Sequence, residues 1–369
     1  MTADPVVILS YARTPMGSFQ GALSAASATE LGATAVKGAV ERAGVSPDDV
    51  EKIFMGCVLP AGLGQAPARQ AAIFAHDMVA AGSADLIVAG GMESMSNAPY
   101  ILKKMRGGAR IGHDVVSDHM MMDGLEDAYD AGRAMGTFAE DTAREYQFTR
   151  DAQDDYAIES LSRAIAAQKT GAFDKEIVGV TVKSRKGETV VTEDEAPGRG
   201  DPVKLRQLKA AFAKEGTITA ASSSSISDGA AALVITRQSV ADAKGLKPVA
   251  RIVGHAAHAQ EPARFTTAPV GAVRKLLDKT GWSANEVDLY EINEAFACVP
   301  MAWMKDLGVA HEKVNVNGGA TALGHPIGAS GGRILTTLLA ALERTGGKRG
   351  IASLCIGGGE ATAVAVELV

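Results

Sequence analysis

An internal repeat is the feature that most constrains the fold of this chain. The stretch SPDDVEKIFMGCV at 46–58 aligns without gaps with SANEVDLYEINEA at 283–295. Each copy follows an apolar helical pattern that ends in a glycine, and each contains an apolar strand pattern. The first strand pattern, at 5–15, also resembles the stretch at 247–257. The sequence therefore predicts two α/β halves of similar layout.

The second half is the longer one. Ile292 and Gly359 lie 359 − 292 = 67 positions apart. We expect this interval to hold a helix, a short strand at Lys313–Val316, a glycine-rich turn, a second helix through Arg333 and a strand that ends in three glycines.

The first half is shorter at the corresponding place. Met55 and Gly91 lie only 91 − 55 = 36 positions apart, and one helical pattern at 68–82 separates the two strands. The difference, 67 − 36 = 31 positions, is enough for a strand, a turn and a helix. We place the seam near Ala75-His76, where two helical fragments run together in phase.

The region between the halves has a different composition, rich in Met, Gly and charged residues. Helical patterns cover Arg133–Tyr146 and Thr149–Lys169, and a serine-rich turn at 220–225 leads into a strand. We interpret it as an insertion that covers one edge of the core, where substrate contacts commonly lie. The predicted division is 1–95 completed by 226–246 as the first half, 96–225 as the inserted loop domain, and 247–369 as the second half.

Composition excludes several classes of protein. The net charge is 37 − 43 = −6, so no broad basic face for nucleic acid is expected. Three scattered cysteines do not make a disulfide framework, and no apolar run reaches the roughly 20 residues of a membrane span. The N-terminus passes directly into a strand pattern. These observations predict a soluble cytoplasmic protein, with neither nucleic acid nor membrane as a partner.

Chemistry is first suggested by the glycine-rich turn at 315–332, which carries His325. Its glycines permit positive φ or close approach to a ligand, and Pro326 fixes the chain just after the histidine. The helix that follows offers its positive end to a developing anion. His325 could therefore act as a base or as an oxyanion donor. The alternative is a capped turn with a surface histidine.

Two further candidates follow strand patterns of the second half. Cys355 ends one strand before three glycines, and Asn293 follows another. The carboxyl ends of parallel strands meet at the functional edge of α/β folds. Glycine N–H groups could lower the pKa of the Cys355 thiol, and Asn293 could hold a water or an oxyanion. The alternatives are a small buried cysteine and an N-cap for the helix through Met304.

Together these motifs resemble those of the thiolase family. The carrying stretches are NEAFA at 293–297, NVNGGATALGHPIGASGGRI at 315–334 and CIGGG at 355–359. The resemblance continues in GLGQAPARQAA at 62–72, AGGMESMSNAPY at 89–100 and ITAASSSSISDGAAALV at 218–234. Several motifs in order at compatible spacing cover essentially the whole chain.

The resemblance implies a five-layer αβαβα fold with two pseudo-repeated halves and a loop domain that binds coenzyme A. It implies reversible condensation or thiolytic cleavage of acyl-CoA, with CoA thioesters as substrates and no separate cofactor or metal. His325 would activate a cysteine nucleophile and stabilise the oxyanion, Cys355 would move the α-carbon proton, and Asn293 would orient a water. The expected pantetheine contacts are Ser224, Met135, Ala295 and Phe296. The family also implies a homo-oligomer, a dimer or a tetramer.

One family motif is missing. Thiolases carry the acyl-accepting cysteine in a first-half motif like N-x-x-C-x-S-G, and this sequence contains none. The absence coincides with the shortened interval of the first half. Cys57 is not expected to replace it, because its neighbour Gly56 pairs with Asn293 in the repeat; Cys298 is expected to pack within a helix. We therefore expect impaired turnover.

Two rival functions remain open. A ketoacyl synthase would share the architecture, but it would need a second histidine where Asn293 stands. A non-catalytic CoA-binding subunit would accommodate the missing cysteine. Arg199 or Lys204 could meet a CoA phosphate or could be ordinary solvated charges, and Glu360 places a charge after the three glycines.

Overall fold

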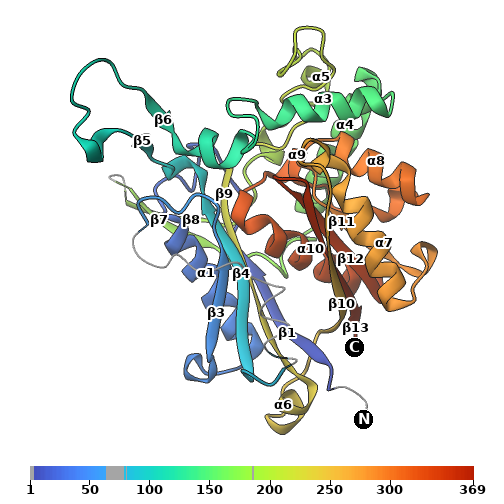
Figure 1. The fold of residues 1–369 in the computed structure, drawn as a ribbon. Helices are drawn as coiled ribbons and strands as arrows, with labels where there is room; N and C mark the ends of the chain where they lie inside the picture. Colours follow the sequence, from blue (N-terminus) through green and yellow to red (C-terminus); the bar gives the residue numbers. More distant parts are fainter. Residues whose placement is uncertain (1–3, 64–78, 80, 185–186) are drawn as a thin grey trace.

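The computed structural model describes residues 4–63, 79, 81–184 and 187–369 (Figure 1). The strands are β1 (Val6–Arg13), β2 (Gly17–Ser18), β3 (Lys52–Gly56), β4 (Leu86–Ser94), β5 (Tyr100–Leu102), β6 (Val116–Asp118), β7 (Val180–Ser184), β8 (Gly187–Val191), β9 (Ser227–Arg237), β10 (Ala250–Ala259), β11 (Leu289–Ile292), β12 (Arg349–Ile356) and β13 (Glu360–Leu368). The α-helices are α1 (Ala28–Ala43), α3 (Met135–Glu145), α4 (Arg150–Lys169), α5 (Pro202–Leu205), α6 (Gln238–Ala243), α7 (Ala268–Thr280), α8 (Cys298–Leu307), α9 (Ala320–Leu323) and α10 (Ser330–Thr345).

The strand order confirms the predicted repeat. The first half runs β3-β4-β9-β1 and the second runs β11-β12-β13-β10. In each half the outermost pair, β3/β4 or β11/β12, is parallel and the remaining neighbours are antiparallel. The two half-sheets meet where β1 pairs with β10 through Val7↔Arg251 and Ile8↔Ala250.

Local details repeat as well. The turn before β3 is a capping box between Ser46 and Asp49, and the turn before β11 is a capping box between Ser283 and Glu286. The sequence alignment of 46–58 with 283–295 superposes these two boxes. In each box a side-chain oxygen accepts a hydrogen bond from an otherwise unpaired backbone N–H, which fixes the direction in which the chain enters the strand.

Alternating side chains divide the first half-sheet between two cores. Val7 and Leu9 of β1 pack in the cluster that contains the buried face of α1. Val6 and Ile8 point to the opposite face, where they join the cluster around Leu338 of α10. This is the period-two alternation expected of a strand buried on both faces.

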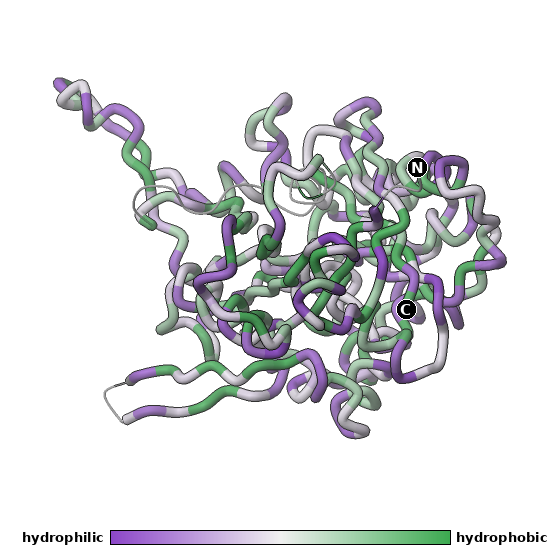
Figure 2. The backbone as a smooth tube through the Cα atoms, turned by 90° about the horizontal axis from the view of Figure 1, so that it is seen from below, coloured by the Kyte–Doolittle hydropathy of each residue, from purple (hydrophilic) through white to green (hydrophobic). Residues whose placement is uncertain are grey.

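The second half-sheet is divided in the same way. Ala361, Ala363 and Ala365 of β13 pack with α7, whereas Val364 and Val366 pack with α10. The layers are therefore α1, the first half-sheet, α10, the second half-sheet, and α7 with α8 (Figure 1). The predicted five-layer αβαβα fold is confirmed. Figure 2 shows hydrophobic segments gathered in the middle of the molecule and hydrophilic segments at its rim.

The region between β4 and β9 projects from this core. It contains the hairpin β5–β6, the hairpin β7–β8 and the helices α3, α4 and α5 (Figure 1). The helices predicted at Arg133–Tyr146 and Thr149–Lys169 are confirmed as α3 and α4, and the Thr149 side chain accepts the N-cap hydrogen bond of α4. The division at residues 95, 225 and 247 stays a prediction.

One predicted element is wrong and another lies outside the described residues. Lys313–Val316 is not a strand: a 3₁₀ turn covers His311–Lys313, and Val314 makes a single bridge to Tyr290 of β11. The glycines that follow let the chain turn away before a ladder can extend. The helix predicted at 68–82 falls mostly on residues outside the described ranges, as does the seam at Ala75-His76. No helix in the described ranges is long and apolar enough to cross a membrane.

A buried ion cluster joins β1 to the inserted region. Arg13 is fully buried and pairs with Glu176 at 2.6 Å and with Asp194 at 2.7 Å. The attraction of its two partners outweighs the burial of the guanidinium and raises the pKa of Arg13. The arginine therefore neutralises two carboxylates that have no access to water.

We expect Arg13→Met to lower the free energy of unfolding by about 3–5 kcal/mol, because it leaves two buried carboxylates without their cation. Urea unfolding followed by circular dichroism measures this loss. Arg251→Met is the matched control, since the Arg251 side chain, which pairs with Glu367, is 48% exposed, and its loss should cost less than about 1 kcal/mol. Equal effects of the two substitutions would contradict the expectation.

Candidate functional site

The candidate site lies at the carboxyl ends of β11 and β12. These strands are parallel neighbours, with Ile292 opposite Ser353. The next residue, Asn293, donates its backbone N–H to the carbonyl of Ser353 at 3.0 Å. The register therefore places Asn293 and Cys355 at the same edge of the second half-sheet, as the sequence predicted.

His325 meets Asn293 at this edge. The chain turns at Gly324, whose φ is +111°, and the backbone N–H of His325 donates to the carbonyl of Ser225 at 3.1 Å. The ring then has a partner on each side: Nδ1 lies 2.5 Å from Oγ of Ser330, and Nε2 lies 3.4 Å from Nδ2 of Asn293. The alternatives of a surface histidine and of an Asn293 N-cap are wrong, because the ring is partly buried between these two partners and α8 begins only at Cys298.

Burial decides the protonation of the ring. It lowers the pKa of His325 to about 4, with a smaller contribution from the positive charge of Arg333. The imidazole is therefore neutral at pH 7. A neutral ring has one nitrogen with a free electron pair, so it is able to take a proton.

Cys355 lies in an apolar environment. It is 9% exposed and packs in a cluster that includes Ala295, Phe296 and Cys298. Burial raises the pKa of its thiol to about 12. The prediction of a lowered pKa is therefore wrong: the loss of hydration disfavours the thiolate more strongly than backbone hydrogen bonding favours it. The resting group is a neutral thiol.

The residues expected to contact pantetheine also gather at this edge. The backbone N–H of Ser224 donates to the carbonyl of Ala295 at 3.0 Å, and Ser223 forms an antiparallel bridge with Phe296. Met135 packs against the cluster that contains Ala295 and Phe296. The structure thus brings Ser224, Met135, Ala295 and Phe296 together from three separate parts of the chain.

Glu294, which the sequence reasoning missed, holds the site together. Its fully buried carboxylate accepts hydrogen bonds from Tyr156 at 2.8 Å and Ser160 at 2.9 Å, both on α4. It also accepts from Asn315 at 2.9 Å and from the hydroxyl of Thr321 at 2.6 Å. One carboxylate therefore ties the end of β11 to the inserted region and to the start of the histidine turn. The sequence signal that could have identified Glu294 is its position directly after the candidate residue Asn293.

Asn315 completes the edge of β11. Its Oδ1 accepts from the N–H of Ile292 and its Nδ2 donates to the carbonyl of Ile292, both at 2.9 Å. The side chain therefore takes the place of a neighbouring strand at one residue. Asn315 has φ = +50°, a left-handed conformation that asparagine tolerates better than most residues.

Cys57 lies at the end of β3, beside a second buried glutamate. Its Sγ is 3.4 Å from Oε1 of Glu93, which is also buried and accepts from the N–H groups of Val58 and Gly328 at 2.9 Å. Burial and the Glu93 carboxylate raise the pKa of the Cys57 thiol to about 12. Cys57 therefore lacks the features of an activated nucleophile, and Cys298 is fully buried at the start of α8.

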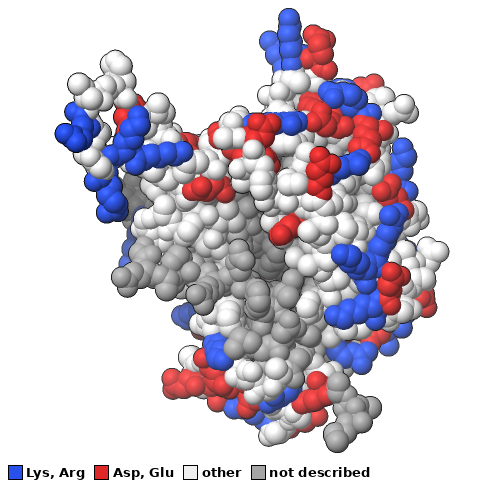
Figure 3. Space-filling view, viewed as in Figure 1, with Lys and Arg blue, Asp and Glu red and all other residues white. Residues whose placement is uncertain are grey.

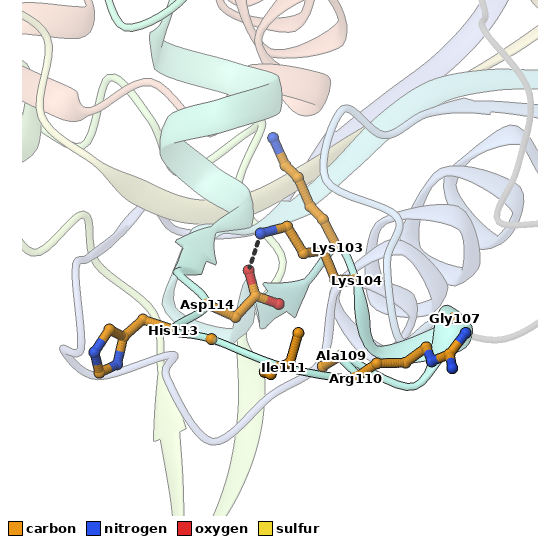
Figure 4. Close-up of a pocket in the computed structure, with 9 residues that line it drawn as sticks. Lys103, Lys104, Gly107, Ala109, Arg110, Ile111, His113 and Asp114 are labelled. Atoms are coloured by element: carbon orange, nitrogen blue, oxygen red, sulfur yellow. Dashed lines mark ion pairs between the residues drawn. The ribbon is translucent and has the colours of Figure 1, made fainter.

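The basic side chains of the surface gather away from the candidate site residues. Figure 3 shows basic side chains grouped on the projecting hairpin β5–β6, and basic and acidic side chains interspersed along the top and right-hand side of the view. A hollow in that hairpin is lined by nine residues between Lys103 and Asp114 (Figure 4). Lys104 pairs there with Asp114 at 3.6 Å. None of the predicted site residues lines this hollow. Arg199 pairs with Glu195, and Lys204 pairs with Asp201 at 3.2 Å.

Comparison with known families agrees with this arrangement. The model of the thiolase N-terminal domain matches residues 6–76 and 73–239, and the model of the thiolase C-terminal domain matches residues 246–368. The chain belongs to the thiolase family. The N-terminal match is broken at 73–76, which includes the seam predicted at Ala75-His76 from the repeat.

Similar proteins extend over the whole chain. Acetyl-CoA acetyltransferase 2 of Arabidopsis thaliana is 48% identical over 393 aligned positions, covering 99% of this chain and 97% of the relative. The cytosolic acetyl-CoA acetyltransferase of Mus musculus is 46% identical, covering 99% and 98%. The crystal structure of the acetyl-CoA acetyltransferase of Bacillus anthracis has a TM-score of 0.96 at 38% identity, covering 100% of this chain and 99% of that one. The Acat5 thiolase of Ascaris suum, solved in complex with coenzyme A, has a TM-score of 0.92 at 40% identity, covering 99% and 100%.

The alignment length shows that this chain is shorter than its relative. The alignment with the Arabidopsis relative spans 393 positions and this thiolase has 369 residues, so at least 393 − 369 = 24 positions of the relative have no counterpart here. The internal repeat gave 67 − 36 = 31 missing positions. Both estimates are long enough for the strand, turn and helix that the motif N-x-x-C-x-S-G would occupy.

We expect Cys57 to react slowly with iodoacetamide at pH 8, at least about 100-fold more slowly than an unstructured cysteine peptide. The thiolate fraction falls tenfold for each unit by which the pKa rises, and the pKa of Cys57 is raised from 9.0 to about 12. Mass spectrometry of the alkylated peptides measures the rate. Glu93→Gln should accelerate it by removing the neighbouring negative charge, whereas a wild-type rate equal to that of the free peptide would contradict the expectation.

Proposed function

We propose that this chain has the scaffold and second-half catalytic groups of an acetyl-CoA C-acetyltransferase. The reaction is the reversible condensation of two acetyl-CoA molecules to acetoacetyl-CoA and CoA. The observation that carries the proposal is the contact of His325 with Asn293 beside the strand that bears Cys355. Its relatives of 44–48% identity are acetyl-CoA acetyltransferases over their full length. The substrates are CoA thioesters, and no separate cofactor is required.

Cys355 is proposed to exchange the proton at the substrate α-carbon. A thiol with a pKa of about 12 is a weak acid, so its thiolate is a strong base. In the cleavage direction, the resting neutral thiol gives its proton to the carbanion released when the carbon–carbon bond breaks. In the condensation direction, the thiol first gives its proton to a departing CoA thiolate. The Cys355 thiolate that remains then takes the α-proton of the next acetyl-CoA, and the enolate attacks the second acetyl thioester, whose thiolate leaves.

His325 is proposed to act on the attacking thiol and on the thioester oxygen, and Asn293 is proposed to hold a water beside it. The neutral imidazole of His325 takes a proton from an attacking thiol, and the resulting N–H then stabilises the oxyanion of the thioester. Asn293 holds a water beside it, and its Oδ1 is buried without a partner among the described residues. An unpaired buried oxygen of this kind is well suited to accept a hydrogen bond from a water.

The pantetheine arm is proposed to lie along Ser224, Met135, Ala295 and Phe296. These residues form an edge of the apolar cluster that contains Cys355. A thioester bound with its arm against this cluster would present its α-carbon to the thiol. We also propose a cytoplasmic location, since a relative from Mus musculus is cytosolic. The family resemblance leads us to propose a dimer or a tetramer as well.

We expect very low turnover from the chain as it stands. Acyl transfer through the enzyme needs a thiolate nucleophile, and the three cysteines are one buried proton carrier, one buried packing residue and the unactivated Cys57. An assay of CoA-dependent acetoacetyl-CoA cleavage should show a rate about 10³-fold or more below that of a version restored to full length with the N-x-x-C-x-S-G segment. Equal rates would overturn this expectation.

The missing nucleophile favours one second function, a non-catalytic CoA-binding subunit. The residues proposed to contact pantetheine lie close together, whereas the motif that would carry the acyl acceptor is missing from the sequence. Calorimetric binding of acetyl-CoA without release of CoA thiol would support this function. Rapid thiol release, detected with a chromogenic disulfide, would exclude it. The ketoacyl synthase alternative is not favoured, because Asn293 occupies the position of the second histidine.

A further inference from the structure

We propose that Ser330 is a positioning residue that fixes the tautomer of His325, so that the resting protein carries the proton on Nδ1 and the free electron pair on Nε2. Ser330 is the first residue of α10 and is fully buried. The consequence for turnover rests on the proposed acyltransferase function. The tautomer itself does not, and it can be measured directly.

The direction of the hydrogen bonds follows from what each group can donate. Oγ of Ser330 donates to the backbone carbonyl of Pro326 at 3.0 Å. A carbonyl can only accept, and a hydroxyl has a single proton. We assign that proton to Pro326, so that the 2.5 Å contact between Oγ and Nδ1 of His325 uses a proton on the imidazole.

The opposite side of the ring agrees with this assignment. Nε2 faces Nδ2 of Asn293 at 3.4 Å, and an amide NH₂ is a donor only. A neutral imidazole carries one proton, so a ring protonated on Nδ1 offers an acceptor at Nε2. An acceptor on the hydroxyl side and a donor on the amide side thus select the same tautomer.

The device is local in sequence. The hydroxyl of a serine in the first turn of a helix readily bonds to the carbonyl four residues earlier, and here that carbonyl belongs to Pro326. The proline ring holds φ at −64° just after the histidine. The five-residue spacing in HPIGAS therefore brings the hydroxyl to the ring without help from distant residues.

The tautomer decides the order of the two roles open to His325. With a free electron pair on Nε2, the resting ring is a base and cannot donate to a thioester oxygen through that atom. When a thiol transfers its proton to Nε2, the thiolate becomes free to attack and the new N–H becomes available to the oxyanion. The ring is thus base first and oxyanion donor second, with Ser330 accepting from Nδ1 throughout.

The test is ¹⁵N NMR of histidine side chains in the chain as it exists. In the wild type, the partly buried His325 ring should show an unprotonated Nε2 and a protonated Nδ1. Ser330→Ala should lose this pattern, with Nε2 becoming protonated or the two tautomers exchanging, and Ser330→Thr should restore it. Thr336→Val is the matched control, because Thr336 lies buried on the same helix and its hydroxyl has no hydrogen-bond partner among the described residues.

The outcomes separate this proposal from the proposed function. A protonated Nε2 in the wild type, or an unchanged tautomer in Ser330→Ala with an unchanged circular dichroism spectrum, would overturn the role of Ser330 whatever the turnover. In the version restored to full length, Ser330→Ala should lower kcat by about 10–100-fold, a part of what general base catalysis contributes, with little change in KM. A fold defect would instead lower the unfolding midpoint of Ser330→Ala, whereas Thr336→Val removes no hydrogen bond within the described residues and should leave the midpoint nearly unchanged.

Discussion

The hydrogen bonds of the buried Glu294 carboxylate are the interactions on which the rest of the site depends. A carboxylate without access to water costs several kcal/mol unless its lone pairs are satisfied. Here hydrogen-bond donors come from α4, from Asn315 and from Thr321. These three partners bring the inserted region, the end of β11 and the start of the histidine turn to one point. The position of Asn293, one residue earlier, is therefore fixed by its neighbour.

A second glutamate holds the turn from the other half of the molecule. Glu93 at the end of β4 accepts from Gly328, three residues after His325, and from Val58 at the end of β3. The backbones are close there: a Cβ on Gly91 would lie 2.0 Å from the carbonyl oxygen of Gly328. Only glycine permits that approach. The histidine turn thus belongs to the second half in sequence and rests on the first half in space.

Repetition and asymmetry together explain what the chain can do. The two halves share strand order and parallel pairs. They differ in chemistry, because β11 and β12 end in Asn293 and Cys355, whereas β3 ends beside Cys57, whose thiol faces a carboxylate. The second half carries the groups that we propose to transfer protons, and the motif expected to hold the acyl acceptor is missing from the first half. We therefore expect binding and proton transfer to persist where acyl transfer through the enzyme does not.

The sequence by itself determined the repeat, the helices α1, α3 and α4 and the strands β1, β4 and β12, because periodicity, caps and glycine-rich turns are local signals. It also made His325, Cys355 and Asn293 the candidate site residues. Tertiary structure decided what those residues are chemically. Burial made the Cys355 thiol a weaker acid, contrary to the local reading of its glycine neighbours, and it made His325 neutral. It also revealed Glu294 and Glu93, whose roles depend on donors more than 100 positions away in the sequence. Desolvation and long-range hydrogen bonds depend on which segments meet, and no local pattern encodes that.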